Sequence, residues 1–141
     1  MSFDQHDTIG FQAALLSRLI SVRLRDALAP LGISPAQAAA LIEIGAADGL
    51  TQKQLVERLD VEQPGVARTL NGLEAEGWIT REQQVGRAQG LHLTDRARAI
   101  LPQTAQVCAE VNRQVLADMS RTEREHLIDR ISEAISALRS G

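Results

Sequence analysis

Apolar residues recur at intervals of three and four along most of the chain, which is the spacing of one buried helix face. The pattern predicts helices over about residues 7–29, 35–47, 52–59, 63–76, from 94 onward, and 120–138. Three of these helices begin with a capping box, in which Ser or Thr is followed three residues later by Gln or Glu. The boxes start at Ser34, Thr51 and Ser120. The chain is therefore expected to be mainly helical.

One segment, residues 78–94, breaks the helical spacing. Leu91 and Leu93 alternate with polar neighbours, and Gly86 and Gly90 bracket a turn. Alternation with a period of two beside turn residues is typical of a β-hairpin. We expect one small hairpin between the fourth and fifth predicted helices.

Composition places the chain among soluble globular proteins. A length of 141 residues fits one domain, and 44% of the residues are hydrophobic and 23% charged. No apolar run approaches the roughly 18 residues of a membrane span, so neither a secretory nor a membrane segment is expected. The single cysteine favours a reducing, cytoplasmic location. No catalytic motif or phosphate loop is present, so we expect no enzyme, cofactor or metal.

Charge alone does not favour nucleic acid, because the net charge is −3 and the pI is near 5.6. The acidic excess lies in the two flanks, while residues 50–98 are balanced. Every cation except Lys53 is arginine, the side chain best suited to phosphate and guanine. The scarcity of aromatic residues argues against base stacking on single strands or RNA.

Residues 50–94 contain two predicted helices, a short turn and the hairpin, which is the order of a winged helix-turn-helix. At 100° per residue, one face of the second helix is apolar and carries Val66, Leu70 and Leu73. The opposite face has no acidic residue and carries Pro64, Arg68, Asn71 and Ala75. Small residues with one Arg and one Asn suit insertion into a major groove.

These segments also resemble a known family. Leu50–Leu59, Val66–Leu70 and Leu73–Ile79 closely resemble the MarR family of bacterial transcriptional regulators, and Leu91–Thr94 with Arg87 before it resembles the family's wing. The wing is about two residues shorter than is usual in the family, and Val85 stands where the family usually carries Asp. Gly65 replaces the usual Ser or Thr, and Glu62 stands where a better N-cap is usual.

The resemblance implies a mainly α fold, in which a winged helix-turn-helix with a small β-hairpin wing is flanked by N- and C-terminal dimerisation helices. We expect a single domain over 1–141, with the winged helix at 33–100 and dimerisation helices at 7–30 and 100–139. The expected function is a homodimeric, sequence-specific regulator of double-stranded DNA with a near-palindromic operator. It would be a repressor that a small, often phenolic, ligand releases.

Candidate site residues follow from the motif and the resemblance. The DNA-binding candidates are Lys53, Gln63, Pro64, Gly65, Arg68, Thr69, Asn71, Arg81 and Arg87. Arg68 is the strongest, because it lies at the centre of the acid-free face. Arg18 and Arg23 are weaker candidates for an effector's carboxylate, since exposed helix charges are the ordinary explanation. Trp78 is expected to be a hydrophobic cap between helix and hairpin.

Two other functions stay open at this point. A winged helix can serve as a protein-interaction or dimerisation module without binding DNA, and the acidic balance permits this. A sensor of oxidants or metal would need a reactive thiol or a ligand cluster. Cys108 shares an apolar stripe with Leu101 and Val115, which indicates an inert buried thiol. Glu125, His126 and Asp129 are more simply a solvated helix face.

Overall fold

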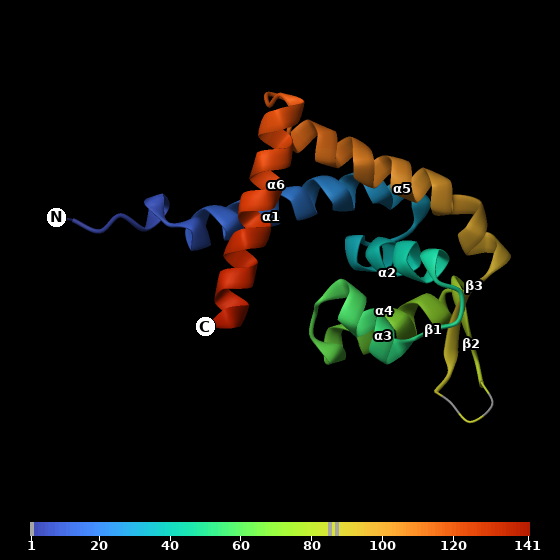
Figure 1. Cartoon of the computed structure of the whole chain (residues 1–141). Helices are drawn as coiled ribbons and strands as arrows, with labels where there is room; N and C mark the ends of the chain where they lie inside the picture. Colours follow the sequence, from blue (N-terminus) through green and yellow to red (C-terminus); the bar gives the residue numbers. More distant parts are fainter. Residues whose placement is uncertain (1, 85, 87) are drawn as a thin grey trace.

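The computed structural model describes residues 2–84, 86 and 88–141. Its helices are η1 (Gln5–Asp7), α1 (Ile9–Leu28), η2 (Ala29–Leu31), α2 (Pro35–Ala46), α3 (Gln52–Leu59), α4 (Gln63–Ala75), α5 (Asp95–Val115) and α6 (Arg121–Ser140). Its strands are β1 (Leu50–Thr51), β2 (Ile79–Glu82) and β3 (Gly90–Leu93). The structure confirms a mainly helical fold with a small hairpin (Figure 1).

Local signals set both ends of α3. Thr51 Oγ1 accepts the Gln54 backbone N–H at 3.2 Å, and Gln54 Oε1 accepts the Thr51 backbone N–H at 2.9 Å. The helix ends at Asp60, which has a left-handed φ of +57° and so turns the chain sharply. The predicted capping boxes at Ser34 and Ser120 also form, at the starts of α2 and α6.

The sheet has three antiparallel strands in the order β1-β3-β2, one strand more than the predicted hairpin. β1 adds the pairs Leu50↔Leu91 and Thr51↔Gly90. Two residues are too few to show alternation, so sequence periodicity could not reveal this strand. Gly90 allows the close pairing, because a Cβ there would lie 3.1 Å from the Gly49 carbonyl oxygen.

The core lies between α2, α3, α4 and the sheet, and we call this part of the chain the winged body. Its largest fully buried apolar side chains are Leu28, Leu41, Ile44, Leu55, Leu70, Leu73, Ile79 and Leu91. In Figure 1, α1 and α5 form a layer against one side of the winged body, and they pack on each other and on α2. Leu28 from α1 and Ala97 from α5 enter the core.

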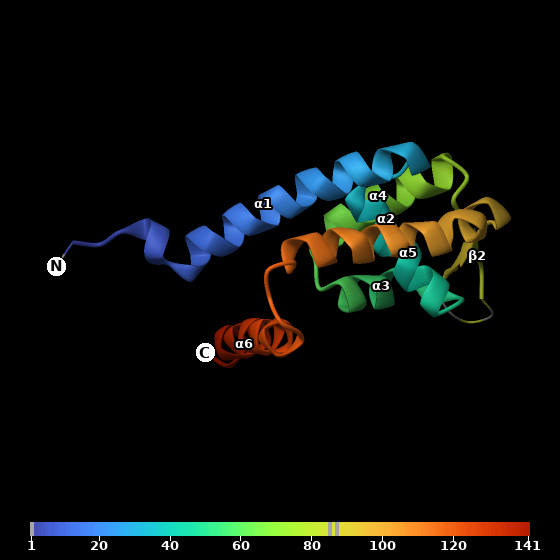
Figure 2. The same cartoon turned by 90° about the horizontal axis from the view of Figure 1, so that it is seen from above.

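The last helix stands apart from the rest of the chain. In Figure 1, α6 passes in front of α1, and Figure 2 shows that the two helices are separated and that α6 leaves the layer that α1 and α5 form. None of its residues is buried. Its tip contacts the winged body through an ion pair between Arg139 and Asp60, both of which are exposed.

No single helix in the described part of the chain is long and apolar enough to cross a membrane. Ile9–Leu31 and Pro35–Ala46 reach that length and composition only together, as a pair bent by 70°.

Candidate nucleic-acid interface

Helix α4 separates an apolar face from a polar face as its sequence predicts. Its buried residues are Val66, Leu70 and Leu73, which pack into the core. The residues predicted to point outward are all exposed: Pro64, Arg68, Asn71 and Ala75. Arg68 makes no hydrogen bond or ion pair with any residue that the structure describes. The helix therefore presents an unpaired guanidinium at the centre of its exposed face.

The start of α4 is open. Gly65 is exposed, and a Cβ built there would meet no atom within 4 Å. Gln63 and Pro64 are exposed in the same first turn, and the N-cap residue Glu62 makes no side-chain cap hydrogen bond. Nothing among the described residues requires glycine at position 65. A helical glycine without an internal role suits close approach by another molecule.

Arg81 on β2 joins three elements of the winged body. Its Nη1 donates to Gln52 Oε1 at 3.2 Å, its Nη2 donates to Asn71 Oδ1 at 2.9 Å, and its Nε lies 3.4 Å from Glu74 Oε1. Only 18% of its side chain is exposed. The sequence marked Arg81 as a phosphate candidate. In the structure its guanidinium instead contacts side chains of α3 and α4.

The other predicted DNA contacts are spread around this centre. Lys53 is exposed on α3. Thr69 is half-buried, and its hydroxyl donates to the Gly65 carbonyl oxygen at 3.0 Å. Arg87 and Val85, two residues before it, lie outside the described residues. Sequence reasoning missed Gln52, since nothing in its local pattern distinguishes it from other polar residues at a helix start.

The base of the hairpin is held by polar contacts. His92 on β3 places Nδ1 2.7 Å from Asp48 Oδ1 and Nε2 3.6 Å from Glu82 Oε2. These contacts join β3 to the turn before β1 and to β2. The hairpin therefore projects from a fixed root beside α3 and α4.

Trp78 is the predicted hydrophobic cap. Its side chain is 3% exposed and packs between the end of α4 and the sheet. The guanidinium carbon of Arg96 lies 3.8 Å from the centre of the Trp78 ring, and Arg96 also donates to the Glu76 carbonyl oxygen. This cation–π contact ties the end of α4 to the first turn of α5.

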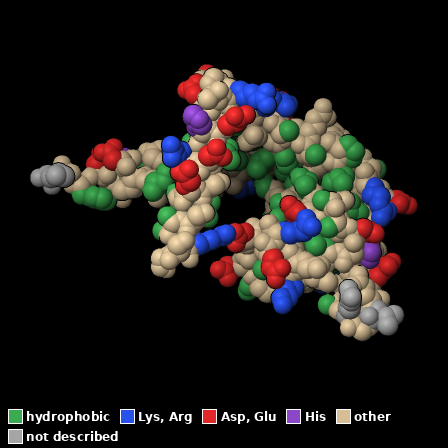
Figure 3. Space-filling model, in the orientation of Figure 1, with side chains coloured by type: hydrophobic (Ala, Val, Ile, Leu, Met, Phe, Trp, Pro, Cys, Tyr) green, Lys and Arg blue, Asp and Glu red, His purple; other side chains and the backbone are tan. Residues whose placement is uncertain are grey.

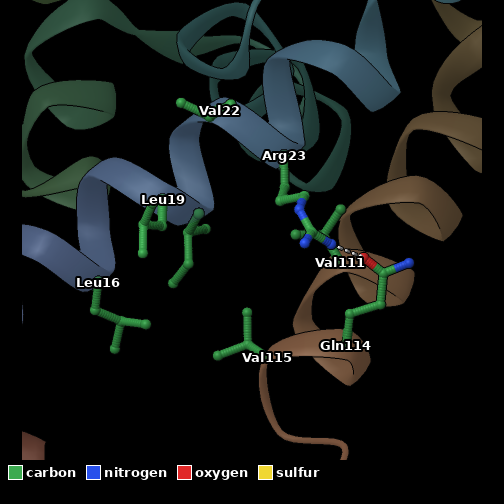
Figure 4. A pocket seen from close by; sticks show the side chains of 8 residues that line it. Leu16, Leu19, Val22, Arg23, Val111, Gln114 and Val115 are labelled. Atoms are coloured by element: carbon green, nitrogen blue, oxygen red, sulfur yellow. Dashed lines mark hydrogen bonds between the residues drawn. The ribbon is translucent and has the colours of Figure 1, made fainter.

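A groove of about 310 Å³ lies between α1 and α5 (Figure 4). Its lining is Leu16, Leu19, Ile20, Val22, Arg23, Val111, Gln114 and Val115. Arg23 donates to Gln114 Oε1 at 3.4 Å across the groove. Arg18 is exposed on the same helix but does not line the groove. Of the two effector candidates, the structure brings only Arg23 to a concave surface.

Cys108 is half-buried on α5, packed against the core. Burial raises the pKa of its thiol, which lowers the thiolate fraction that reacts with oxidants. Within the described ranges, no group of three or more His, Cys, Asp or Glu could hold a metal ion. Neither observation favours a sensor of oxidants or metal.

A helix-turn-helix with an exposed reading helix and a rooted hairpin defines the class of winged-helix DNA-binding proteins. The comparisons with known proteins agree. The family model of the MarR family matches residues 31–88. A Bacillus subtilis (strain 168) protein described as an uncharacterized HTH-type transcriptional regulator, YwoH, is 29% identical over 110 residues, which cover 77% of this chain and 80% of that protein.

Solved structures match nearly the whole chain. A structure of the Staphylococcus aureus MepR–DNA complex has a TM-score of 0.86 and 20% identity, and covers 96% of this chain and 99% of its own. A structure of MarR has a TM-score of 0.79 and 26% identity, with 99% of both chains covered. The family model covers the winged helix-turn-helix of this chain, and the solved structures extend the likeness in fold over nearly its full length. The chain is therefore similar to the MarR family of transcriptional regulators.

Proposed function

We propose that two copies of the chain bind a near-palindromic operator in double-stranded DNA and repress transcription in the cytoplasm. The observation that carries the proposal is the exposed face of α4, with Arg68 unpaired among the described residues and no acid at its centre. Guanidinium and amide groups on such a face are donors for guanine and phosphate oxygens. The DNA in the MepR complex supports the same partner for this chain.

The dimer is supported by apolar surface that one copy leaves uncovered. On α6 these side chains recur at intervals of three and four: Ile128, Ile131, Ile135 and Leu138. On α1 the exposed ones include Ile9, Leu16, Leu19 and Val22. Figure 3 shows hydrophobic surface in the hollow between α6 and the rest of the chain. A second copy that covers these faces would place two α4 helices side by side for successive major grooves.

A small effector is the third part of the proposal. The groove between α1 and α5 has the volume of a small ligand site, and Arg23 supplies a donor for a carboxylate. The 3.4 Å contact of Arg23 with Gln114 is long for a hydrogen bond and would be exchanged readily. A ligand at this groove would alter how α1 and α5 hold the two winged bodies. By linkage, bound DNA would weaken the binding of the ligand by the same factor by which the ligand weakens the binding of DNA.

Footprinting of the purified protein on DNA beside its own gene tests the proposal. We expect protection of a near-palindrome whose half-sites lie about one helical turn, roughly 34 Å, apart. A scrambled duplex of equal length is the control. Affinity for the operator and for the scrambled duplex should each fall steeply as the salt concentration rises. Equal affinity for operator and scrambled DNA, or no binding at low salt, would contradict it. Addition of aromatic acids then tests release, with sedimentation to show that the dimer persists.

A further inference from the structure

We propose that Arg81 is a positioning residue, which turns the side-chain amides of Gln52 and Asn71 so that both offer N–H donors to the DNA. The pair then binds a hydrogen-bond acceptor on the duplex, either a phosphate oxygen or the acceptor edge of a base. This inference rests on the proposed binding of DNA through α4. It assigns Gln52 to the DNA interface, and it gives Arg81 the role of orienting residues that contact DNA.

The orientation of the two amides follows from the chemistry of their shared partner. One guanidinium reaches both, with Nη1 3.2 Å from the Gln52 amide and Nη2 2.9 Å from the Asn71 amide. Guanidinium nitrogens only donate, so the amide atom that faces them must be the oxygen. Asn and Gln amides are otherwise free to flip. Arg81 therefore fixes which end of each amide points away from it.

The amide nitrogens are left without a protein partner. In the described part of the chain, no oxygen accepts a hydrogen bond from Asn71 Nδ2 or Gln52 Nε2. Asn71 is exposed and Gln52 half-exposed. Each NH2 group carries two N–H donors, so one arginine sets the orientation of two donor groups, one on α3 and one on α4.

This polarity restricts what the pair can bind. An asparagine that reads adenine uses both ends of its amide, accepting from N6 and donating to N7. In this chain the Asn71 oxygen already accepts from Arg81. Arg81 holds that oxygen toward itself, so the ends of the two amides that point away from it are NH2 donors. These donors match acceptor groups, such as phosphate oxygens and the O6/N7 edge of guanine.

Arg81 itself is poorly placed to be the phosphate ligand. Its side chain is 18% exposed, and the carboxylate of Glu74, which is itself exposed, lies 3.4 Å from its Nε as a counter-charge. A phosphate would have to displace contacts that tie β2 to α3 and α4. The two amides that it holds are more open to solvent, since Asn71 is exposed and Gln52 half-exposed, and neither amide nitrogen has a partner among the described residues.

The first experiment measures DNA affinity for Gln52→Ala and Asn71→Ala, on operator and on scrambled duplex. Each should lose about fivefold or more. An equal loss on both duplexes identifies a phosphate, and a loss of guanine preference at one operator position identifies a base. Unchanged affinity in both variants would overturn the proposal. So would a wild-type adenine preference that Asn71→Ala abolishes, because a bidentate contact with adenine needs the amide oxygen that Arg81 holds toward itself.

The second experiment asks whether Arg81 acts through the amides. Arg81→Lys keeps the charge but loses the fork that bridges two amides, so affinity should fall about as far as in the double variant Gln52→Ala/Asn71→Ala. In that double background, Arg81→Lys should change affinity less than about twofold. An equal loss of affinity in the wild-type and double-variant backgrounds would show that Arg81 contacts DNA itself. No loss of affinity in either background would overturn its role as a positioning residue.

Controls separate this inference from the proposed function. Arg98→Lys on α5 is the matched substitution, since Arg98 is exposed and, among the residues that the structure describes, pairs only with Asp95 in the same helix turn. Thermal melting and sedimentation check that each variant is folded and assembled. If the Arg81 variant does not fold, the two alanine variants decide the outcome. Failure of the wild type to bind DNA would contradict the proposed function, whereas normal wild-type binding with insensitive variants would contradict only the role of the amides.

Discussion

The winged body and the two terminal helices, α1 and α6, bury their apolar side chains to different extents. The winged body places its large apolar residues in one core, and side chains such as Arg81 and His92 join its elements. Of the two terminal helices, α1 contributes Leu28 to that core but leaves other apolar side chains exposed, and α6 contributes none. Leu19 is 54% exposed and Leu138 is 85% exposed, and α6 buries none of its residues.

The difference separates two kinds of surface. A polar reading face can remain in water until DNA arrives, because water satisfies Arg68 and Asn71 in the free protein. A long apolar helix face is costly in water and is normally covered permanently. We therefore expect the winged body to be complete in one copy, and the terminal helices to be complete only in two.

The largest expected effect comes from charging the face of α6. Ile131→Asp with Ile135→Asp should convert a dimer into a monomer, because carboxylates cannot be buried there unpaired. Operator affinity should fall by about a hundredfold or more, since one winged body reads one half-site. Sedimentation and fluorescence anisotropy measure the two effects. Arg130→Ala on the same helix is the control, and a persistent dimer in the charged variant would show that α6 is not the interface.

Truncation of leucines on the two sides sharpens the comparison. In the monomeric double variant, Leu70→Ala should lower the free energy of unfolding by about 2–5 kcal/mol, because it leaves a cavity in the core. Leu138→Ala in the same background should change it by less than about 0.5 kcal/mol, since the side chain is already exposed. Denaturant titration compares them. Similar losses would mean that α6 belongs to the fold of one copy.

Arg68→Ala tests the reading face itself. The substitution should cost about 1–3 kcal/mol of operator affinity and reduce the preference for operator over scrambled DNA. The free energy of unfolding should stay unchanged, because Arg68 has no partner among the residues that the structure describes. Arg121→Ala on α6 is the matched control. Wild-type affinity in Arg68→Ala would contradict the outward assignment of this face.

The sequence predicted most of the fold because the relevant signals are local. Capping boxes at Thr51 and Ser120 and the stripe of Val66, Leu70 and Leu73 each depend on residues close in the chain. Strand β1 was not predicted, because its two residues form a strand only through their pairing with β3.

The candidate site was predicted less completely, for a related reason. Arg68 could be placed by helical periodicity, and the structure shows it exposed as expected. Arg81 could not, because its partners Gln52 and Asn71 lie 29 and 10 residues away in the chain. Periodicity gives the face of an element but not the contacts that a long side chain makes across the fold. The amides that Arg81 orients are therefore visible only in three dimensions.

The smallest expected effect on stability tests whether DNA approaches the backbone of α4. Gly65→Ala should raise the free energy of unfolding by up to about 1 kcal/mol, because alanine favours the helix and its Cβ would meet open space. The same substitution should lower operator affinity, because that space is where DNA would lie.

Gly10→Ala is the matched control, since Gly10 also lies in the first turn of a helix, α1, with no atom within 4 Å of a Cβ. It should add stability without changing operator affinity. Opposite signs of stability and affinity at Gly65 alone would locate the DNA at this turn, whereas equal behaviour of the two variants would show that nothing approaches α4 there.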